Sequence, residues 1–493
     1  MQMDADMEIG LPEADLVAAD AADRIRAAVD ELAVLLGPTG VSRSPVTRLA
    51  YARDAYPVAI RQVLHGTERY EPDAVAWPTS AGEVAAVLAI ARRHGLEVVP
   101  YGAGSGIVGG ALAGPGSLVL DLKRLSRFID LDPVAMTATV EAGILGKELE
   151  DILNAEGFTC GHYPQSLFSS TVGGWVAHRG VGTFSTRYGK IDDLVLGLQV
   201  VLADGTVVDA KPEPQSAAGP DLKRLFLGSE GTLGIITRVT LQVYPLPEAR
   251  RFVGFGCRTF AEGLDAVRHM VQAGYRPAAV RLYDPIEARE RLGIDPGSTD
   301  SLLIGIVEGP PALVDATMAA FGEVARARGL TDVGDGYARQ WLESRFSTAR
   351  LVTTNESPTG IADALEVANG WSRLGETYER MKAAMEAAVG GGLVYGHASH
   401  FYHSGANLYM IFHAVADRAE EVETRYRAVL SAAFDACLAT GGTLTHHHGV
   451  GIGKRDYMPA ELGPGGYELL ARVRDALDPD GILNPGKLTL GGR

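Results

Sequence analysis

The chain has 493 residues, of which 46% are hydrophobic, enough to fill the cores of two or three domains. Its 45 Lys and Arg residues against 61 Asp and Glu give a net charge of −16, which argues against a nucleic-acid partner because phosphate contacts need clustered basic residues. Three scattered cysteines exclude a disulfide framework or a cysteine-based zinc site, and the acidic N-terminus and the lack of a long apolar run predict a cytoplasmic protein whose lipid contacts, if any, are peripheral.

The alternation of short apolar runs and helical stretches predicts an α+β protein in four parts. A helical lead-in occupies residues 1–65, with a helix over about 14–36. Strand-like runs and turns follow over 66–247, and "VLADGTVVD" predicts a hairpin there because Asp-Gly lies between two apolar runs. Long helical patterns alternate with strands over 248–450, which predicts a second α+β domain, and the turn-rich 451–493 closes the chain.

The stretch "GSGIVG" at 104–109 matches the dinucleotide-binding pattern G-x-G-x-x-G, but its surroundings do not. In a Rossmann unit a helix begins at the third glycine. Here a helix over 80–95 and a strand over 96–101 precede the glycines, and the following "GALAGPGSLVLDL" contains too much Gly and Pro to begin a helix. The loop therefore predicts a phosphate cradle of backbone N–H groups outside a Rossmann unit.

Four motifs occur in order along most of the chain: "PYGAGSGIVGG", "YPQSLFSSTVGGWVAHRGVGTFSTRYGKIDDLV", "GSEGTLGIITRVTL" and "DPDGILNPGKL". Together they resemble the vanillyl-alcohol-oxidase family of FAD enzymes, also called PCMH-type. Within it, "TCGHYPQSL", "VRLYD", "HSGANLYMIF" and "GGTLTHHHGVG" are most similar to the alkyl-dihydroxyacetonephosphate synthases. The resemblance implies an FAD-binding domain of two subdomains, an α+β cap domain for the substrate, a C-terminal segment that returns to the FAD-binding domain, and a homodimer.

The resemblance also assigns residues to FAD. The glycine loop would wrap the pyrophosphate, the second motif would lie along the flavin, and the third would hold the adenine side. The residues concerned are Tyr101, Gly102, Ala103, Gly104, Ser105, Gly106, Ile107, Gln165, Ser166, Leu167, Ser170, Thr171, Gly174, His178, Val181, Glu230, Ile235 and Ile236. No His or Cys occurs in "PYGAGSGIVGG", through which some members attach the flavin, so we expect FAD to be bound without a covalent bond.

Related FAD-dependent D-2-hydroxyacid dehydrogenases carry two histidines and a glutamate that can hold a metal ion and orient the hydroxyacid. In this chain Tyr402, Tyr409 and His447 occupy those positions, so we expect no metal there. Three consecutive histidines on a strand would also point to alternating faces and could not easily share one ion. The remaining candidates for an adventitious metal site are His397, His400 and His403.

The synthase resemblance implies a redox-neutral exchange on acyl-dihydroxyacetone phosphate, a step in ether lipid formation. A base removes a proton from C1, the carbon joins flavin N5, the carboxylate leaves, and a long-chain alcohol adds. Tyr409 would move the proton, with a phenol pKa lowered by its neighbours. The supporting residues would be His446, His447 and His448 as proton relays, Arg281 and His162 near the flavin, and Arg350 at the substrate phosphate, with Arg345 as its alternative.

The second function that the sequence allows is that of an FAD-dependent oxidoreductase, a dehydrogenase or oxidase of a D-2-hydroxyacid or another alcohol. There the flavin would accept hydride and pass electrons onward. The two functions differ in whether turnover needs an electron acceptor. Because "ADALEVANGW" differs from the synthase pattern beside the substrate pocket, the sequence leaves the phosphorylated or lipid-like substrate open.

Overall fold

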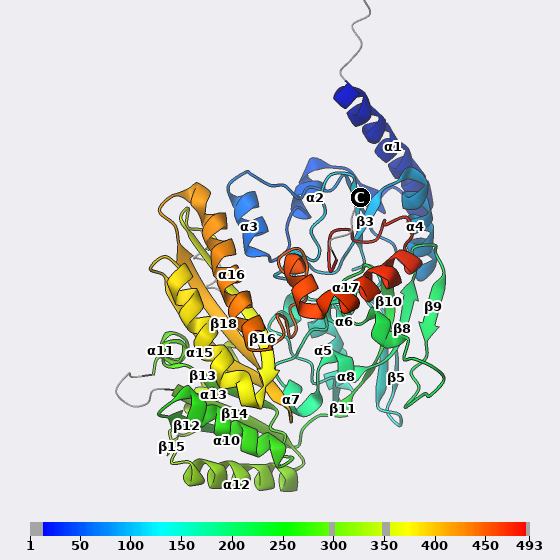
Figure 1. The fold of residues 1–493 in the computed structure, drawn as a ribbon. Coiled ribbons are helices and arrows are strands. Elements are labelled where there is room, and N and C mark those ends of the chain that lie inside the picture. The colour runs from blue at the N-terminus through cyan, green and yellow to red at the C-terminus, as the bar shows by residue number, and fades with distance from the viewer. Residues whose placement is uncertain (1–12, 295–300, 348–354, 490–493) are drawn as a thin grey trace, which may run out of the picture.

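The computed structural model describes residues 13–294, 301–347 and 355–489, with side chains from residue 23 onward. Figure 1 shows the first half of the chain, coloured blue to teal, beside the later helices and strands, coloured green to orange. Both helices and strands are present throughout these ranges, which confirms the α+β class. None of the described helices combines the length and apolarity that a membrane span requires.

The first sheet has the strand order β1-β2-β4-β3, in which only the pair β1–β2 is antiparallel. Its strands are β1 (Val41–Ser42), β2 (Ala74–Ala76), β3 (Glu97–Tyr101) and β4 (Ser117–Asp121). Helix α4 (Ala81–His94) packs on this sheet, and the long α1 (Glu13–Leu36) packs on α4. The predicted helix over 80–95 is confirmed because Ser80 caps its start and Gly95, with φ of 64°, ends it.

The second sheet is antiparallel and has the order β5-β6-β10-β8-β9. Its strands are β5 (Phe128–Asp132), β6 (Thr137–Glu141), β8 (Val195–Val201), β9 (Val207–Ala210) and β10 (Ile235–Gln242). Strands β8 and β9 form the predicted Asp-Gly hairpin, in which Gly205 has a φ of 86°. Helices α5 (Gly146–Ala155) and α6 (Val172–His178) pack against this sheet through a shared hydrophobic core.

A seven-stranded antiparallel sheet with the order β15-β12-β14-β13-β17-β18-β16 follows. Its strands are β12 (Ala249–Cys257), β13 (Ala279–Tyr283), β14 (Ser301–Gly309), β15 (Thr331–Asp332), β16 (Gly360–Gly370), β17 (Leu393–Phe401) and β18 (Gly405–Val415). The helices packed in its main core are α10 (Phe260–Gln272), α12 (Pro311–Ala327), α15 (Trp371–Ala388) and α16 (Val422–Ala439). These helices cover one face, and α7 (Ser185–Tyr188) from the first half of the chain packs on strands of the same sheet.

The C-terminal part returns to the first sheet after α17 (Met458–Leu477), drawn in red in Figure 1. Leu483 forms a parallel bridge with Val98 of β3. The Lys487 ammonium donates a hydrogen bond to the Leu112 carbonyl at 2.7 Å, so the tail is tied to the glycine-rich segment after β3. The shorter elements are α2 (Pro45–Ala50), α3 (Pro57–Leu64), β7 (Phe158–Thr159), α8 (Ile191–Leu194), α9 (Lys223–Phe226), β11 (Tyr244–Pro245), α11 (Pro285–Leu292) and α13 (Gly336–Ser344).

Candidate active site

A row of four side chains crosses the seven-stranded sheet on one face. Strand pairing sets Glu366 opposite Tyr409, Tyr409 opposite His397, and His397 opposite Tyr283. Directly opposed residues of antiparallel strands share a face, so the register alone brings a carboxylate, a phenol and an imidazole together. The rings of His397 and Tyr409 stack with centroids 5.0 Å apart and planes 11° apart. Tyr409 is therefore held between the Glu366 carboxylate and the His397 ring inside the protein.

The histidine run 446–448 forms a loop around Glu366. The Glu366 carboxylate accepts the backbone N–H groups of all three histidines, the last of them at 2.9 Å. It also accepts the Thr445 hydroxyl at 2.9 Å and the Lys454 ammonium at 3.1 Å. Burial by itself raises the pKa of Glu366, but Lys454 and the surrounding histidines outweigh it and lower the pKa to about 2. The assumption of a strand at 446–448 is wrong, because one buried carboxylate collects these N–H groups.

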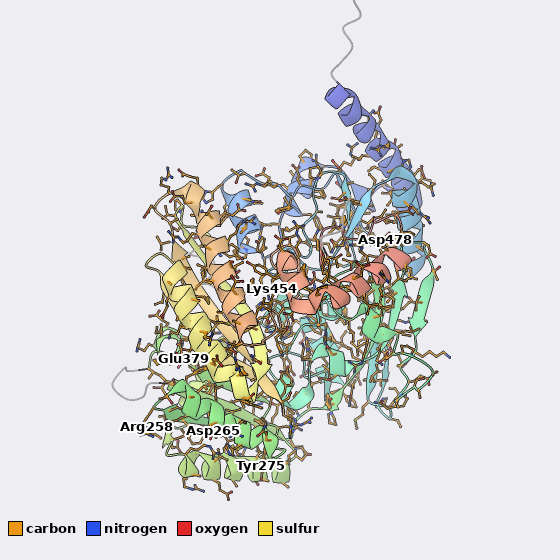
Figure 2. The ribbon with its side chains drawn as sticks, viewed as in Figure 1. Arg258, Asp265, Tyr275, Glu379, Lys454 and Asp478 are labelled. Carbon is orange, nitrogen blue, oxygen red and sulfur yellow. The ribbon has the colours of Figure 1, made fainter. Side chains whose placement is uncertain are left out.

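Glu366, His446 and His447 place ligand atoms within 4.8 Å of one another, a spacing compatible with a metal ion. The carboxylate, however, already accepts five hydrogen bonds, one of them from a lysine cation. A carboxylate offers about four lone-pair sites, so Glu366 has none to spare for a metal. Figure 2 shows Lys454 near the middle of the molecule, between the seven-stranded sheet and the first half of the chain. Glu366 thus organises the histidine loop.

Tyr409 and His448 form a hydrogen bond suited to proton transfer. The Tyr409 hydroxyl lies 3.0 Å from His448 Nε2. Burial lowers the pKa of His448 to about 4, so the ring is neutral. The Glu366 carboxylate near Nδ1 favours the tautomer with hydrogen on Nδ1, in which Nε2 accepts from the Tyr409 hydroxyl. Nδ1 lies 3.5 Å from the Glu366 carboxylate and has no hydrogen-bond partner among the described residues. A phenol, an imidazole and a carboxylate thus follow one another, the arrangement by which proteins activate a weak acid or nucleophile.

The expected lowering of the Tyr409 pKa is wrong. Burial and the Glu366 charge raise the pKa of this phenol, and the positive charges of Arg281 and Arg291 offset only part of the rise. Tyr409 is therefore protonated in the resting protein. To act as a base it must first pass its proton to His448, whose cation the Glu366 carboxylate would stabilise.

A second tyrosine joins the same loop. The Tyr402 hydroxyl lies 2.7 Å from His446 Nε2, and His446 Nδ1 lies 2.9 Å from His447 Nδ1, so one of these two nitrogens carries a hydrogen. Burial lowers the pKa of His446 to about 3, and the positive charge of Lys190 adds to this effect. The Lys190 ammonium also donates to the His446 carbonyl at 2.6 Å. Two neutral imidazoles therefore extend the hydrogen-bonded network from the loop toward the sheet.

The three histidines considered for an adventitious metal site do not converge. Arg281 donates to His397 Nε2 at 2.9 Å, and His397 Nδ1 lies 2.9 Å from Glu287, so both ring nitrogens have partners. His400 Nδ1 is bonded to the Ser185 hydroxyl at 2.7 Å. The His403 side chain is exposed. Arg281 lies on the same face of the sheet as Tyr409, because it is two residues from Tyr283, which pairs with His397.

The glycine loop after β3 forms a cradle of bare backbone. Gly104 and Gly109 have φ values of 66° and 77°, which residues with a Cβ rarely adopt. Gly110 lacks room for a side chain, because a Cβ there would lie 2.6 Å from His178 Nε2. That nitrogen is buried without a hydrogen-bond partner in the described part of the chain. No helix begins after the loop, which confirms the departure from a Rossmann unit.

The histidine loop reaches the same cradle. A Cβ at Gly449 would lie 2.5 Å from Glu230 and 2.9 Å from the His178 ring. Glu230 accepts the next two backbone N–H groups of that loop at 2.5 and 2.8 Å. The Asn484 amide donates to the carbonyls of Gly110 and Glu230 at 2.9 and 2.6 Å. Bare backbone N–H groups beside a proton-transfer chain fit a bound dinucleotide cofactor whose pyrophosphate lies on the glycine loop.

Helix α6 meets the glycine loop at its first turn. A Cβ at Gly102 would collide with the Thr171 hydroxyl, which caps α6 by accepting the Gly174 N–H at 3.2 Å. By contrast, Ile235 and Ile236 bury their side chains in hydrophobic cores, so only their backbone could face a cofactor. The other residues assigned to FAD lie at the end of β3 and in the glycine loop, or in the segment 165–181. They are Tyr101, Ala103, Ser105, Gly106, Ile107, Gln165, Ser166, Leu167, Ser170 and Val181.

We expect Gly110→Ala to weaken FAD binding about tenfold or more, because the added methyl group must displace the His178 ring or the loop. Gly114→Ala is the matched control, since a Cβ at that position of the same segment meets nothing within 4 Å. Titration of each apoprotein with FAD, followed by flavin fluorescence, measures both affinities. Equal affinities for the two variants would show that the cofactor does not approach Gly110.

The residues considered for substrate binding have different environments. His162 is fully buried against Trp175, with ring centroids 4.6 Å apart, and both its nitrogens are without a hydrogen-bond partner in the described ranges. Burial lowers the pKa of His162 to about 3. The Arg345 guanidinium packs on Phe346 at 4.2 Å, and burial lowers its pKa to about 10, so it stays charged at neutral pH. Arg350 lies outside the described residues.

Sequence reasoning missed three buried ionisable residues of the site, Glu366, Lys454 and Glu287. Only Glu366 has a visible signal, because it is the single charged residue among apolar neighbours in "ALEVA". A charged residue in a buried strand requires a partner, and that partner is too far along the chain to be recognised from spacing. The motif comparison drew attention to the histidines and the tyrosine, but not to the groups that orient them.

Comparisons with known proteins agree with this geometry. Residues 72–211 match the family model of an FAD binding domain, and residues 246–488 match that of the C-terminal domain of FAD linked oxidases. The uncharacterized FAD-linked oxidoreductase YgcU of Escherichia coli (strain K12) is 32% identical over 433 residues, which cover 85% of this chain and 89% of YgcU. An alkyldihydroxyacetonephosphate synthase of Trypanosoma brucei brucei is 29% identical over 497 residues, which cover 93% of this chain and 80% of that synthase.

The fold is also shared with solved structures. A structure of an alkyldihydroxyacetonephosphate synthase superposes with a TM-score of 0.80 at 25% sequence identity, and the match covers 94% of this chain and 86% of that one. The region that matches the first family model contains the glycine loop, and the region that matches the second contains the seven-stranded sheet. The chain therefore belongs to the family of FAD-linked oxidases and has its two-domain, PCMH-type FAD-binding fold.

Proposed function

We propose that this protein is an FAD-dependent enzyme of the alkyl-dihydroxyacetonephosphate synthase type, which exchanges the acyl group of acyl-dihydroxyacetone phosphate for a long-chain alcohol. The observation that carries the proposal is the chain of Tyr409, His448 and Glu366. It is a proton-transfer device, and its tyrosine stands where a hydroxyacid-oxidising relative needs a metal ligand. An ester-to-ether exchange is redox-neutral, so it needs proton movement and no electron acceptor.

In the proposed reaction Tyr409 moves the proton of the substrate carbon. The phenol passes its proton to His448 Nε2, 3.0 Å away, while the Glu366 carboxylate stabilises the imidazolium, and the phenolate then removes a proton from C1. FAD, when bound, supplies an electron sink for that carbon. The acyl group leaves as a carboxylate, and the incoming alcohol adds to the carbon and loses its hydroxyl proton to solvent. Tyr409 gives its proton back to C1 and recovers one from His448, so both side chains return to their starting states. One ester C–O bond breaks and one ether C–O bond forms, so electrons balance.

Cations around this chain would position the anionic parts of the substrate. Arg281 lies close enough to lower the Tyr409 pKa in part, so its charge would favour the phenolate. Arg345 has no carboxylate partner among the described residues, and either it or Arg350 would bind the substrate phosphate in a forked geometry. His162, whose buried nitrogens lack partners, would face the flavin or the substrate.

The second candidate function is oxidation of an alcohol or D-2-hydroxyacid. It is supported by the similarity to YgcU, a protein described as an FAD-linked oxidoreductase. The neutral His448 is also a suitable acceptor for the proton of an alcohol, whose carbon would give hydride to the flavin. This reaction reduces the flavin, so it needs an electron acceptor in every turnover.

Anaerobic mixing of the holoenzyme with each substrate, followed by flavin absorbance, separates the two functions. For the synthase we expect bleaching by palmitoyl-dihydroxyacetone phosphate that is reversed by hexadecanol without any acceptor. Bleaching by a D-2-hydroxyacid or an alcohol that is reversed only by an acceptor would overturn the synthase proposal and establish the oxidoreductase. Product analysis by mass spectrometry would identify the ether-linked ketone in the first case.

We also expect FAD to be released when the protein is denatured, because the glycine loop has no His or Cys to attach it. Acid precipitation followed by absorbance of the supernatant and the washed pellet measures the released and retained flavin. Yellow colour that stays with the pellet would contradict non-covalent binding and point to a tether elsewhere in the chain.

A further inference from the structure

Behind Tyr409 lies a second chain of polar side chains, formed by Glu287, His397 and Arg281. His397 Nδ1 lies 2.9 and 3.0 Å from the two oxygens of Glu287, and Arg281 donates to His397 Nε2 at 2.9 Å. The side chains of His397 and Glu287 are only 3% and 1% exposed. The His397 ring is the one that stacks on Tyr409, so this chain touches the proposed proton-transfer centre.

The donors and acceptors of this chain can be assigned without ambiguity. A guanidinium group only donates hydrogen bonds, so His397 must accept at Nε2. The ring hydrogen is then on Nδ1, where it is donated to the Glu287 carboxylate. A protonated His397 would have no lone pair for Arg281, and burial together with the Arg281 charge lowers the pKa of His397 well below its ordinary value. Burial raises the pKa of Glu287 to about 7, so the neutral ring connects a partly ionised carboxyl group to the Arg281 cation.

The surrounding fold holds Glu287 rigidly. Asp284 caps α11 by accepting the Glu287 N–H at 2.8 Å, and it also accepts the N–H of Gly396 at 2.9 Å. The first turn of α11 is therefore locked to β17 one residue before His397. The Arg281 guanidinium rests on the Trp341 ring at 5.0 Å. These contacts leave little freedom for either end of the chain.

A buried carboxylate is costly for folding, and a well-packed apolar residue would serve stability as well or better. The polar side chain of Glu287 is thus better explained by the hydrogen bond that it accepts from His397 Nδ1. This hydrogen bond fixes the His397 ring, and the ring in turn fixes one hydrogen bond of Arg281 and so restricts the direction of its remaining N–H groups. Arg281 lies on the face of the sheet that carries Tyr409, because it is two residues from Tyr283, which pairs with His397.

We propose that Glu287 and His397 are positioning residues that hold Arg281 in the active site, oriented for an anionic group of the substrate beside Tyr409. His397 acts through Arg281, and it does not itself exchange protons. The inference relies on the proposed function only for the choice of assay, because the hydrogen-bonded chain is a property of the folded protein.

A double-mutant cycle in the holoenzyme tests the coupling. His397→Leu and Arg281→Leu should each lower kcat/KM about 10- to 100-fold, the worth of a buried hydrogen bond to a charged group, and the double variant should lose no more than either single one. His397→Gln should retain most activity, because its amide can accept from Arg281 and donate to Glu287. The kcat/KM of Glu287→Gln should lie between those of His397→Leu and His397→Gln. Losses that multiply in the double variant would overturn the proposal.

Glu141→Gln is the matched control for a buried carboxylate that pairs with an arginine away from the site. Glu141 accepts Arg127 at 2.7 Å in β6, so its change should lower the melting temperature without lowering kcat/KM. If His397→Leu behaves in the same way, with lower stability and unchanged kcat/KM, Glu287 and His397 only fasten α11 to β17 and the proposal fails.

A measurement without substrate separates this inference from the proposed function. In holoenzyme labelled with nitrogen-15 histidine, the signal lost in His397→Gln belongs to His397. We expect it to show hydrogen on Nδ1 and no titration between about pH 6 and 8. Hydrogen on Nε2, or titration in that range, would overturn the assignment of the chain. If the wild type oxidises an alcohol and makes no ether, the cycle is measured in that assay, and only the synthase proposal is lost.

Discussion

Replacing Tyr409 with Phe is expected to lower turnover by about 10²- to 10⁴-fold, the usual contribution of a positioned acid or base. The hydroxyl group is the only part removed, and the ring can stay stacked on His397, where the wild-type centroids lie 5.0 Å apart. Because the hydroxyl is bonded to His448 at 3.0 Å, the variant interrupts the path between substrate and imidazole. Steady-state assays of ether formation measure the loss, and FAD titration should show unchanged cofactor binding.

Tyr188→Phe is the control for removal of a buried phenol. The Tyr188 hydroxyl donates to Glu308 at 2.7 Å, away from the histidine loop, so this variant should be less stable by about 1 kcal/mol or more and keep its turnover. Turnover in Tyr409→Phe within about threefold of the wild type would rule out Tyr409 as the proton carrier. His448 would then be the remaining group for that role.

Glu366→Gln is expected to destabilise the protein by about 3–5 kcal/mol and to lower turnover at the same time, because it leaves Lys454 buried without an anion. Its amide NH₂ would also face the backbone N–H groups that the wild-type carboxylate accepts. Urea unfolding followed by tryptophan fluorescence measures the free energy of unfolding. The histidine loop should lose its fixed conformation, so Tyr409 and His448 would no longer meet at hydrogen-bond distance.

A second substitution distinguishes charge from packing. Adding Lys454→Met to Glu366→Gln removes the unpaired cation, so part of the stability should return while turnover stays low. Full stability in the single variant would mean that the pair of Glu366 and Lys454, 3.1 Å apart, contributes little to folding. Restored turnover in the double variant would show that the loop does not need the carboxylate.

The same carboxylate predicts a pH dependence of stability. Its pKa is lowered from 4.5 to about 2 in the folded protein, so its contribution is present above pH 4.5 and is lost as the pH falls toward 2. The shift corresponds to a contribution on the order of 3 kcal/mol. The difference in unfolding free energy between wild type and Glu366→Gln should therefore shrink over that range, and a constant difference would contradict the lowered pKa. Burial raises the pKa values of three other carboxyl groups, Asp54, Glu287 and Asp363, to about 7. Their contribution to the pH dependence is the same in both proteins, so it cancels in the difference.

Local patterns predicted most of the elements correctly. The helix over 80–95 begins at Ser80 and ends at Gly95, where a polar cap and a left-handed glycine are the signals. The hairpin of β8 and β9 turns at Asp-Gly, and no helix follows the glycine loop. Each of these features depends on residues within a few positions of one another. Periodicity and turn residues are therefore sufficient to predict them.

The sequence by itself determined the family and the FAD-binding fold, since the ordered motifs are visible in one dimension, and it predicted the tyrosine and histidines of the candidate site. Only the tertiary structure decided how those residues work. Strand register sets Tyr409 between Glu366 and His397, and burial keeps the phenol protonated and the imidazoles neutral. Register, desolvation and the pairing of buried charges depend on groups far apart in the chain, and neither composition nor spacing records which of them meet.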